Sequence, residues 1–197
     1  APLAPASRTV VVELPTPSSV GALVADLLDK QLGPTAVELQ LPQPRLLIRF
    51  ESVESAAEQQ AAITAKLAEG YGWKVRVLDG DDEFALWREY SRRPFETEGT
   101  VIKLSILPSE VSGTLLWLEK ATITYKLTYE LSGRVGVGVM YLKLDGDDEA
   151  QERFLKELRG RLPVGQGSAT IVRATSNLKS RVDVWGPVGD GLNIMRA

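Results

Sequence analysis

The segment AVELQLPQPRLLIRF, residues 36–50, contains two strand patterns separated by a short stretch with two prolines. AVELQL (36–41) and PRLLIRF (44–50) are rich in apolar residues and are bounded by turn formers. Such a pair favours two consecutive strands joined by a turn around Pro42 and Pro44.

The flanking segments extend this pair into a six-element unit. RTVVVEL (8–14) is rich in β-branched residues, which favours a strand. After Ser18, a potential helix cap, apolar residues recur at helical spacing until Gly33-Pro34. A helix at 52–70 and a strand at 72–80 complete the order β-α-β-β-α-β, which is the ferredoxin-like unit.

The same order recurs in the second half of the chain. A linking helix is predicted at 81–95. The elements predicted after it are a strand at 100–107, a helix at 108–121, strands at 123–131 and 134–144, a helix at 147–162 and a strand at 168–175.

Matching landmarks in the two halves indicate a duplication. Pro15 and Pro108, Phe50 and Leu144, and Val77 and Val172 are separated by 93, 94 and 95 residues. We therefore predict an α+β fold of duplicated ferredoxin-like units, whose antiparallel sheet has helices on one face and a partly open second face. The predicted division is residues 1–80, a linking helix at 81–99, residues 100–178, and a C-terminal strand, turn and incomplete helix at 179–197.

Composition excludes several classes of chemistry. The 197 residues carry a formal net charge of −3 and contain no cysteine and no histidine. Thiolate metal sites, Cys nucleophiles and Ser-His pairs are therefore excluded, and no catalytic or metal-ligating residue is predicted. The charge does not favour nucleic-acid binding, and the sequence contains no membrane-spanning run and no recognisable signal peptide.

GRVGVGVMYLKL (133–144) is the first candidate binding segment. If it is a strand, Gly136 and Gly138 lie on the opposite face from Val135, Val137 and Val139. Glycine inside a strand often marks close approach by a ligand or by another backbone, so a cofactor contact and a packing contact or bulge remain open.

LKSRVDVWG (178–186) is the second candidate. As a strand it would place Arg181 and Trp185 on one face, and with Lys179 they could contact an anionic, planar ligand. The alternative is a solvated or interface strand on which Arg181 pairs with Asp183.

Three further segments have simpler interpretations. The segment at 85–95 combines three arginines with Trp87, Tyr90 and Phe95, as in an anion or partner patch, but such a helix can equally pack its aromatic residues inward. GPVGDG (186–191) departs from the dinucleotide-binding spacing and fits a turn capped by Asp190. DGDD (145–148) fits a helix N-terminus and lacks the final glutamate of a calcium loop.

Four stretches resemble one family: LLIRFESVESAAEQ, LWREY, KLSILPSE and RATSNLKSRVDVWGPVGDGLNIMRA. They are similar to the C-terminal part of the smaller FAD-binding subunit of bacterial glycolate oxidase, the E subunit, in the FAD-linked oxidase superfamily that includes vanillyl-alcohol oxidase. The resemblance implies a cap, or substrate, domain that covers FAD held by a separate domain. It also implies that the chain is a fragment without that domain, inactive alone and not expected to hold FAD itself.

One departure from the family bears on chemistry. Related 2-hydroxy-acid oxidases carry an HxGDGNxH-like motif where this chain has GRVGVGVMY, and of that motif only Gly136 and Gly138 remain. The resemblance therefore implies partners: its own FAD-binding domain, a second flavoprotein subunit and an iron–sulfur subunit, at a cytoplasmic location or at the membrane surface through those subunits. The alternatives are a subunit-docking scaffold without chemistry and, less favoured, an RNA-binding ferredoxin-like domain, whose aromatic strand motif is missing.

Overall fold

Two βαββαβ units follow each other along the chain and share one sheet. The computed structural model describes residues 5–162 and 167–187. The first unit comprises β1 (Ala6–Glu13), α1 (Val20–Asp29), β2 (Ala36–Leu41), β3 (Arg45–Ser52), α2 (Glu54–Gly70) and β4 (Lys74–Leu78). The second comprises β5 (Thr100–Ser105), α4 (Val111–Tyr125), β6 (Thr128–Arg134), β7 (Val139–Asp145), α5 (Asp148–Arg161) and β8 (Ser168–Arg173).

Three short 3-10 turns and two further helices complete the described part. Helix α3 (Gly80–Arg92) and the turn η2 (Arg93–Phe95) link the two units, and α6 (Ser176–Arg181) follows β8. The turns η1 (Pro17–Ser19) and η3 (Pro108–Glu110) precede α1 and α4. The predicted α+β fold of duplicated ferredoxin-like units is confirmed.

The eight strands form one antiparallel sheet in the order β4-β1-β3-β2-β6-β7-β5-β8. The first half has the ferredoxin-like order, and the second half has the same order reversed. The two halves join where β2 pairs with β6, with Leu39 opposite Gly133. Each unit therefore meets its copy through the same strand, as in a pseudo-twofold arrangement.

A single shift of 94 residues relates the two cores. It matches Val10 with Leu104, Ile48 with Leu142 and Ala61 with Leu155, all of them buried. The predicted correspondence of Phe50 with Leu144 fits this shift, whereas those at Pro15 and Val77 each deviate by one residue. The sheet register does not support the match of Val77 with Val172, because Val77 lies opposite Val10, whereas Leu104, the counterpart of Val10, lies opposite Ala169.

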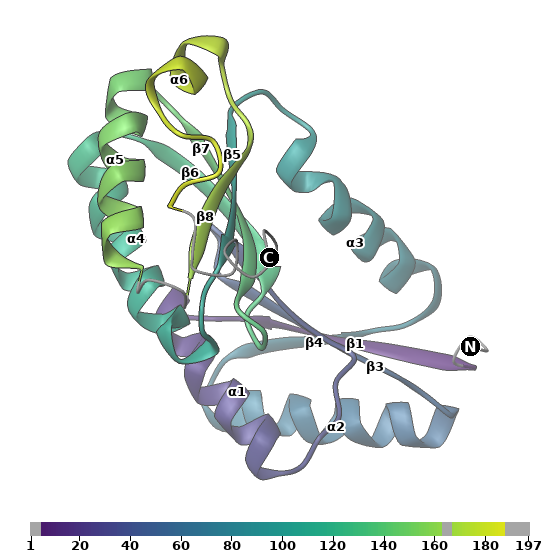
Figure 1. Cartoon of the computed structure of the whole chain (residues 1–197). Helices are drawn as coiled ribbons and strands as arrows, with labels where there is room; N and C mark the ends of the chain where they lie inside the picture. The colour runs from purple at the N-terminus through teal and green to yellow at the C-terminus, as the bar shows by residue number, and fades with distance from the viewer. Residues whose placement is uncertain (1–4, 163–166, 188–197) are drawn as a thin grey trace, which may run out of the picture.

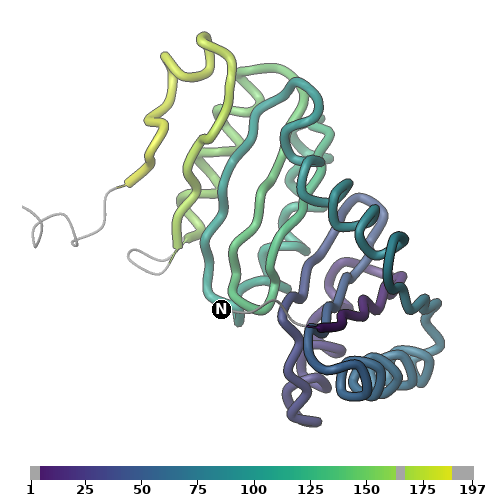
Figure 2. The backbone as a smooth tube through the Cα atoms, turned by 90° about the vertical axis from the view of Figure 1, so that its right-hand side faces the viewer, coloured from purple at the N-terminus to yellow at the C-terminus, as the bar shows by residue number. Residues whose placement is uncertain are grey.

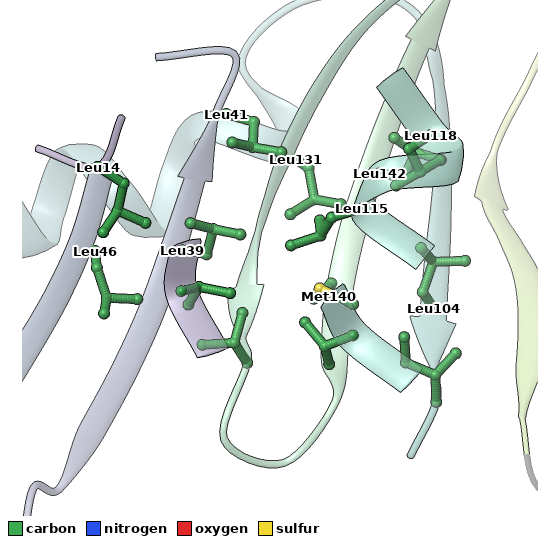
Figure 3. Packing of buried hydrophobic residues seen from close by; sticks show 14 of the residues in the cluster. Leu14, Leu39, Leu41, Leu46, Leu104, Leu115, Leu118, Leu131, Met140 and Leu142 are labelled. Carbon is green, nitrogen blue, oxygen red and sulfur yellow. The ribbon is translucent and has the colours of Figure 1, made fainter. Parts of the chain in front are cut away.

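The hydrophobic core lies between one face of the sheet and four helices, α1, α2, α4 and α5 (Figure 1). It includes Leu23 of α1, Ala57 of α2, Leu118 of α4 and Phe154 of α5. Figure 3 shows leucines from β2, β3 and β6 directed to the same side of the sheet as Leu115 and Leu118 of α4. Because side chains alternate along a strand, the intervening residues face the other side.

The strand predicted at 123–131 begins too early. Helix α4 continues to Tyr125, and Lys126 ends it in the left-handed conformation with φ 55°. Ala121 and Thr122 are buried at helical spacing from Leu118, so packing keeps this β-branched segment helical. In the described part of the chain, no helix combines the length and the apolar character that crossing a bilayer requires.

Candidate functional site

The sheet face opposite the four core helices, hereafter the open sheet face, carries Thr9 of β1, Glu38 of β2, Ser132 of β6 and Tyr141 of β7. These residues alternate with core residues along their strands. Helix α3 runs across one part of this face, and Figure 2 shows no helix in front of β5, β7 and β8. The four core helices therefore lie on one face, as predicted, and the linking helix α3 lies on the other.

Polar contacts hold the first turns of α3 on the open sheet face. Glu83 is only 3% exposed and accepts hydrogen bonds from the hydroxyls of Ser7 at 2.5 Å and Thr9 at 2.6 Å. Arg49 Nε lies 3.2 Å from the same carboxylate, and Trp87 Nε1 donates to Thr9 Oγ1 at 2.8 Å. This Glu83 cluster satisfies a buried charge with three donors, as a buried carboxylate requires.

A second buried carboxylate, Glu38 of β2, meets α3 at Tyr90, two helical turns beyond Glu83. Tyr90 donates to Glu38 Oε2 at 2.5 Å, and Arg134 Nε donates to Glu38 Oε1 at 2.9 Å. Burial, together with the neighbouring Glu38 carboxylate, raises the pKa of Tyr90 far above its ordinary value. Tyr90 therefore remains a protonated donor to Glu38 throughout the physiological range.

A cavity of about 230 Å³ lies between this part of the sheet and the end of α3 with η2. Its sheet side is formed by residues of β2, β6 and β7, including Glu38, Ser132 and Tyr141, and its helix side includes Tyr90 and Phe95. The rings of Phe95 and Tyr141 meet edge to face, with centroids 5.5 Å apart. The cavity therefore combines aromatic walls with an ion pair between the buried Glu38 and the largely exposed Arg134.

The remainder of the open sheet face has a mixed surface. Lys103 of β5 is exposed, and Tyr141 of β7 and Thr170 of β8 are half-buried beside it. Lys103 pairs in register with both Tyr141 and Thr170. These three neighbouring side chains form a small polar and aromatic surface without a covering helix.

The expectation that Gly136 and Gly138 lie within a strand is wrong. Residues 135–138 form the turn between β6 and β7, so the predicted alternation of faces does not apply. Gly138 has φ 71°, and a Cβ there would lie 1.9 Å from the Ile106 carbonyl oxygen. This glycine permits close approach by the chain's own backbone, which was one of the two interpretations.

Gly136 differs from Gly138. A Cβ at Gly136 would meet nothing within 4 Å, and the residue lines a cavity of about 380 Å³ beside α1. The other lining residues are mainly apolar and include Leu28 and Val137, whose exposed fractions are 73% and 59%. The two glycines therefore have different surroundings, although the sequence treats them alike.

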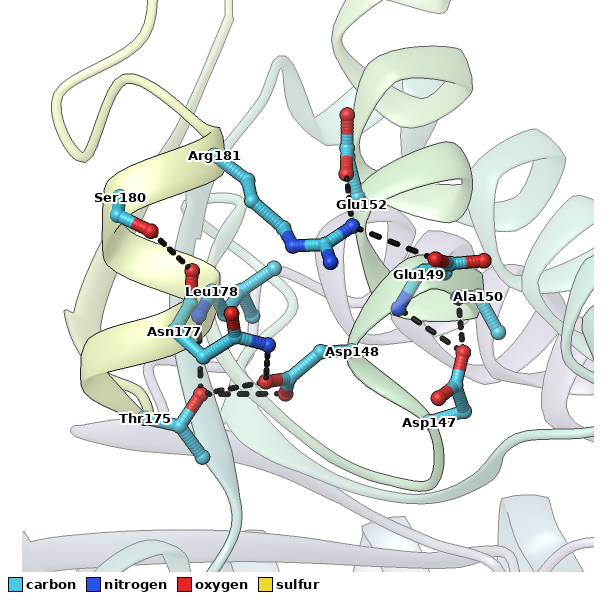
Figure 4. A network of polar contacts seen from close by, with 10 residues as sticks. All are labelled: Asp147, Asp148, Glu149, Ala150, Glu152, Thr175, Asn177, Leu178, Ser180 and Arg181. Atoms are coloured by element: carbon cyan, nitrogen blue, oxygen red, sulfur yellow. Dashed lines mark hydrogen bonds and ion pairs between the residues drawn. The ribbon is translucent and has the colours of Figure 1, made fainter.

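The strand predicted at 178–186 is also wrong. Lys179 and Arg181 lie in helix α6, which Thr175 caps by accepting a hydrogen bond from the Leu178 amide at 3.0 Å. Arg181 Nη1 lies 3.6 Å from Glu149 and 3.5 Å from Glu152, so α5 carboxylates neutralise it (Figure 4). The alternative pairing of Arg181 with Asp183 is replaced by these contacts.

Trp185 lies beyond α6 with 74% of its surface exposed. Its backbone runs beside β8, where the Val184 carbonyl accepts from the Ile171 amide at 2.9 Å. Lys179 is exposed on α6. Because a helix and an irregular segment replace the strand, the shared face predicted for Arg181 and Trp185 is not formed.

The other predicted segments have structural roles. Asp147 of the DGDD segment caps α5 by accepting from the Glu149 and Ala150 amides. Trp87 and Tyr90 face the sheet while Arg88 and Arg92 are exposed, which is the inward-packing alternative for 85–95. Most of GPVGDG (186–191) lies outside the described residues. Within 5–162 and 167–187, no group of acidic side chains is arranged to hold a metal ion.

Sequence reasoning did not single out Glu38 or Glu83. Glu38 lies in AVELQL, where Val37, Leu39 and Leu41 are interrupted by Glu38 and Gln40, and this alternation could have indicated a polar face. Glu83 has no comparable signal, because its partners Ser7, Thr9 and Arg49 come from distant strands.

No protein-family model matches the chain, and no curated protein matches it either.

Proposed function

We propose that the chain is the cap domain of an FAD-dependent 2-hydroxy-acid oxidase subunit of the glycolate oxidase type. The single observation that carries the proposal is a duplicated ferredoxin-like sheet whose second face is uncovered over β5, β7 and β8. The stretches LLIRFESVESAAEQ, LWREY, KLSILPSE and the segment from Arg173 onward add support from the sequence.

The open sheet face fits one side of a flat ring rather than a whole dinucleotide. Lys103, Tyr141 and Thr170 form a surface patch, and the cavity beside them, at about 230 Å³, is smaller than typical cofactor sites. This arrangement suits a domain that covers a flavin held by another domain.

The flavin, when bound, would supply the redox chemistry. This chain would exclude water from one side of the ring through Tyr141 and Thr170. Lys103 would supply a positive charge to the same space, favouring an anionic substrate or added electron density on the flavin. No side chain of this domain is proposed to act as a nucleophile or general base.

The proposed partners follow from the same assignment. They are an FAD-binding domain, a second flavoprotein subunit that performs hydroxy-acid oxidation, and an iron–sulfur subunit. The complex would be cytoplasmic or held at the membrane surface by its other subunits.

The test is to purify the polypeptide that carries this chain, release any flavin by denaturation and quantify it by absorbance. We expect one FAD per polypeptide, and no flavin on residues 1–197 expressed alone. A polypeptide of full natural length that is purified without flavin would contradict the proposal.

A matched pair of charge reversals tests the role of the open sheet face. Lys103→Glu should lower the flavin reduction potential, because a nearby cation stabilises the reduced flavin. The exposed Lys120→Glu, on α4 at the opposite side of the sheet, should leave the potential unchanged. Equal potentials in the two variants would place the flavin elsewhere.

A second candidate function, a subunit-docking scaffold without chemistry, is favoured by one observation. The groove between α1 and the β6–β7 turn is lined by Leu28 and Val137, which are both largely exposed. Co-purification with partner subunits in a flavin-free complex that Leu28→Asp abolishes would support this function over the flavin proposal.

A further inference from the structure

The cavity beneath the end of α3 has the size of a site for one small ring. Its volume is about 230 Å³, whereas an apolar cavity of roughly 150 Å³ holds a benzene ring. The edge-to-face pair of Phe95 and Tyr141 and the side chains of Pro94 and Val139 provide apolar walls. One aromatic ring with a short substituent therefore fits this volume.

The polar groups at the cavity offer both acceptors and donors. Glu38, 5% exposed, supplies carboxylate oxygens that already accept from Tyr90 and Arg134 and retain further lone pairs. Ser132 lines the cavity, and the residue as a whole is 5% exposed. Its hydroxyl can therefore donate a hydrogen bond to a molecule bound in the cavity.

The charges at the cavity balance each other. Arg134 neutralises Glu38 at 2.9 Å. The pair therefore leaves no uncompensated charge in the cavity for an ionic ligand to neutralise. A neutral ligand binds there without the cost of desolvating a further charge.

We propose that this cavity is a binding site for a neutral, planar aromatic molecule that carries a primary amide. The amide NH₂ donates to Glu38, the amide carbonyl accepts from Ser132, and the ring packs against Phe95 and Tyr141. An amide is the small neutral group that offers a donor pair and an acceptor together, and it matches the groups lining the cavity. The inference concerns this chain alone and does not depend on the flavin proposal.

The experiment is an NMR titration of the isotope-labelled chain with benzamide, followed through its backbone amide signals. We expect shifts centred on Ser132, Gly133 and Tyr141. Sodium benzoate, benzylamine and toluene are the matched probes for an anion, a cation and a ring without a polar group, and each should bind more weakly than benzamide. Benzoate or benzylamine binding as tightly as benzamide would overturn the proposal.

Two variants test the assigned hydrogen bond. Ser132→Ala should weaken benzamide binding about fivefold, as expected for one neutral hydrogen bond, and should leave toluene binding unchanged. Ser105→Ala, on β5 of the same sheet and outside the cavity lining, is the control and should not change either affinity. Shifts centred elsewhere, or equal benzamide affinities for wild type and Ser132→Ala, would refute the site, provided that the spectra show both variants folded.

Discussion

The two faces of the sheet are closed in different ways, although the same eight strands supply both. Four helices cover one face with a continuous apolar core that includes Phe50, Leu118 and Phe154. On the other face, a single helix is joined to the strands by hydrogen bonds at the buried carboxylates Glu83 and Glu38. Apolar packing is non-directional and tolerant, whereas buried carboxylates require specific donors at defined positions. The helix-covered face therefore supplies most of the stability, and the open sheet face holds α3 in one position and leaves room for a cavity.

The largest expected effect is at the helix-covered face. Phe154 is fully buried against Trp117 and Tyr125, so Phe154→Ala should lower the free energy of unfolding by about 3–5 kcal/mol. Urea denaturation measures this change. Phe84→Ala on α3, where the ring is 67% exposed, is the control and should change stability by less than about 1 kcal/mol. Similar losses in both variants would remove the distinction between the faces.

The second effect concerns the Glu83 cluster. Glu83→Ala leaves the hydroxyls of Ser7 and Thr9 and the Arg49 guanidinium without their shared acceptor, and should cost about 2 kcal/mol. Glu89→Ala, at an exposed position of the same helix, should cost no more than about 0.5 kcal/mol. If Glu83→Ala unfolds no more easily than Glu89→Ala, polar contacts do not hold α3.

The third effect is smaller and depends on pH. Tyr90→Phe removes one hydrogen bond to Glu38 and should cost about 1 kcal/mol at neutral pH. Tyr71→Phe, which removes an exposed hydrogen bond to Asp26, is the control and should cost less.

The contribution of Tyr90 to stability depends on pH with a definite sign. The folded state raises the pKa of Tyr90, so the contribution is fully present below the pKa of an unfolded tyrosine, about 10, and is lost as the pH rises above it. Above that pH the unfolded chain loses the Tyr90 proton first, which lowers wild-type stability by about 1.4 kcal/mol per pH unit relative to Tyr90→Phe. A constant difference between the two proteins from pH 7 to 11 would contradict a buried, protonated Tyr90.

The smallest effect lies at the surface of the helix-covered side. Hydrogen bonds from Tyr125 and Trp117 lower the pKa of the Glu157 carboxyl. The stabilisation that ionised Glu157 provides is present above the ordinary glutamate pKa. It is lost as the pH falls through the lowered pKa of Glu157 in the folded protein. Trp117→Phe should move the Glu157 pKa back toward its ordinary value in an NMR titration, whereas the exposed Trp185→Phe should not.

Element order could be predicted from the sequence because each element carries a local signal. Strands with β-branched residues, the apolar spacing of α1 and the Asp147 cap of α5 depend only on neighbouring residues. Even the duplication was visible, because equivalent core residues keep a nearly constant separation along the chain.

The candidate site could be predicted only in outline. An open second face was expected, but its important residues were not, because Glu83 and Glu38 obtain their partners from other strands and from α3. Gly136 and Gly138 were placed in a strand since alternating valines favour one, whereas the hairpin turn there is defined by the pairing of Arg134 with Val139. At 178–186, similar alternation was overridden by the Thr175 cap and by burial of Leu178.

The sequence by itself determined the βαββαβ order, its repetition and the absence of imidazole and thiol chemistry, because these depend on composition and on short-range periodicity. Only the tertiary structure decided that the two units join through β2 and β6, that α3 crosses the open sheet face and that Glu38, Tyr90 and Arg134 meet beside a cavity. Glu38 and Arg134 are separated by 96 positions in the chain, and only pairing across the sheet brings them within hydrogen-bonding distance.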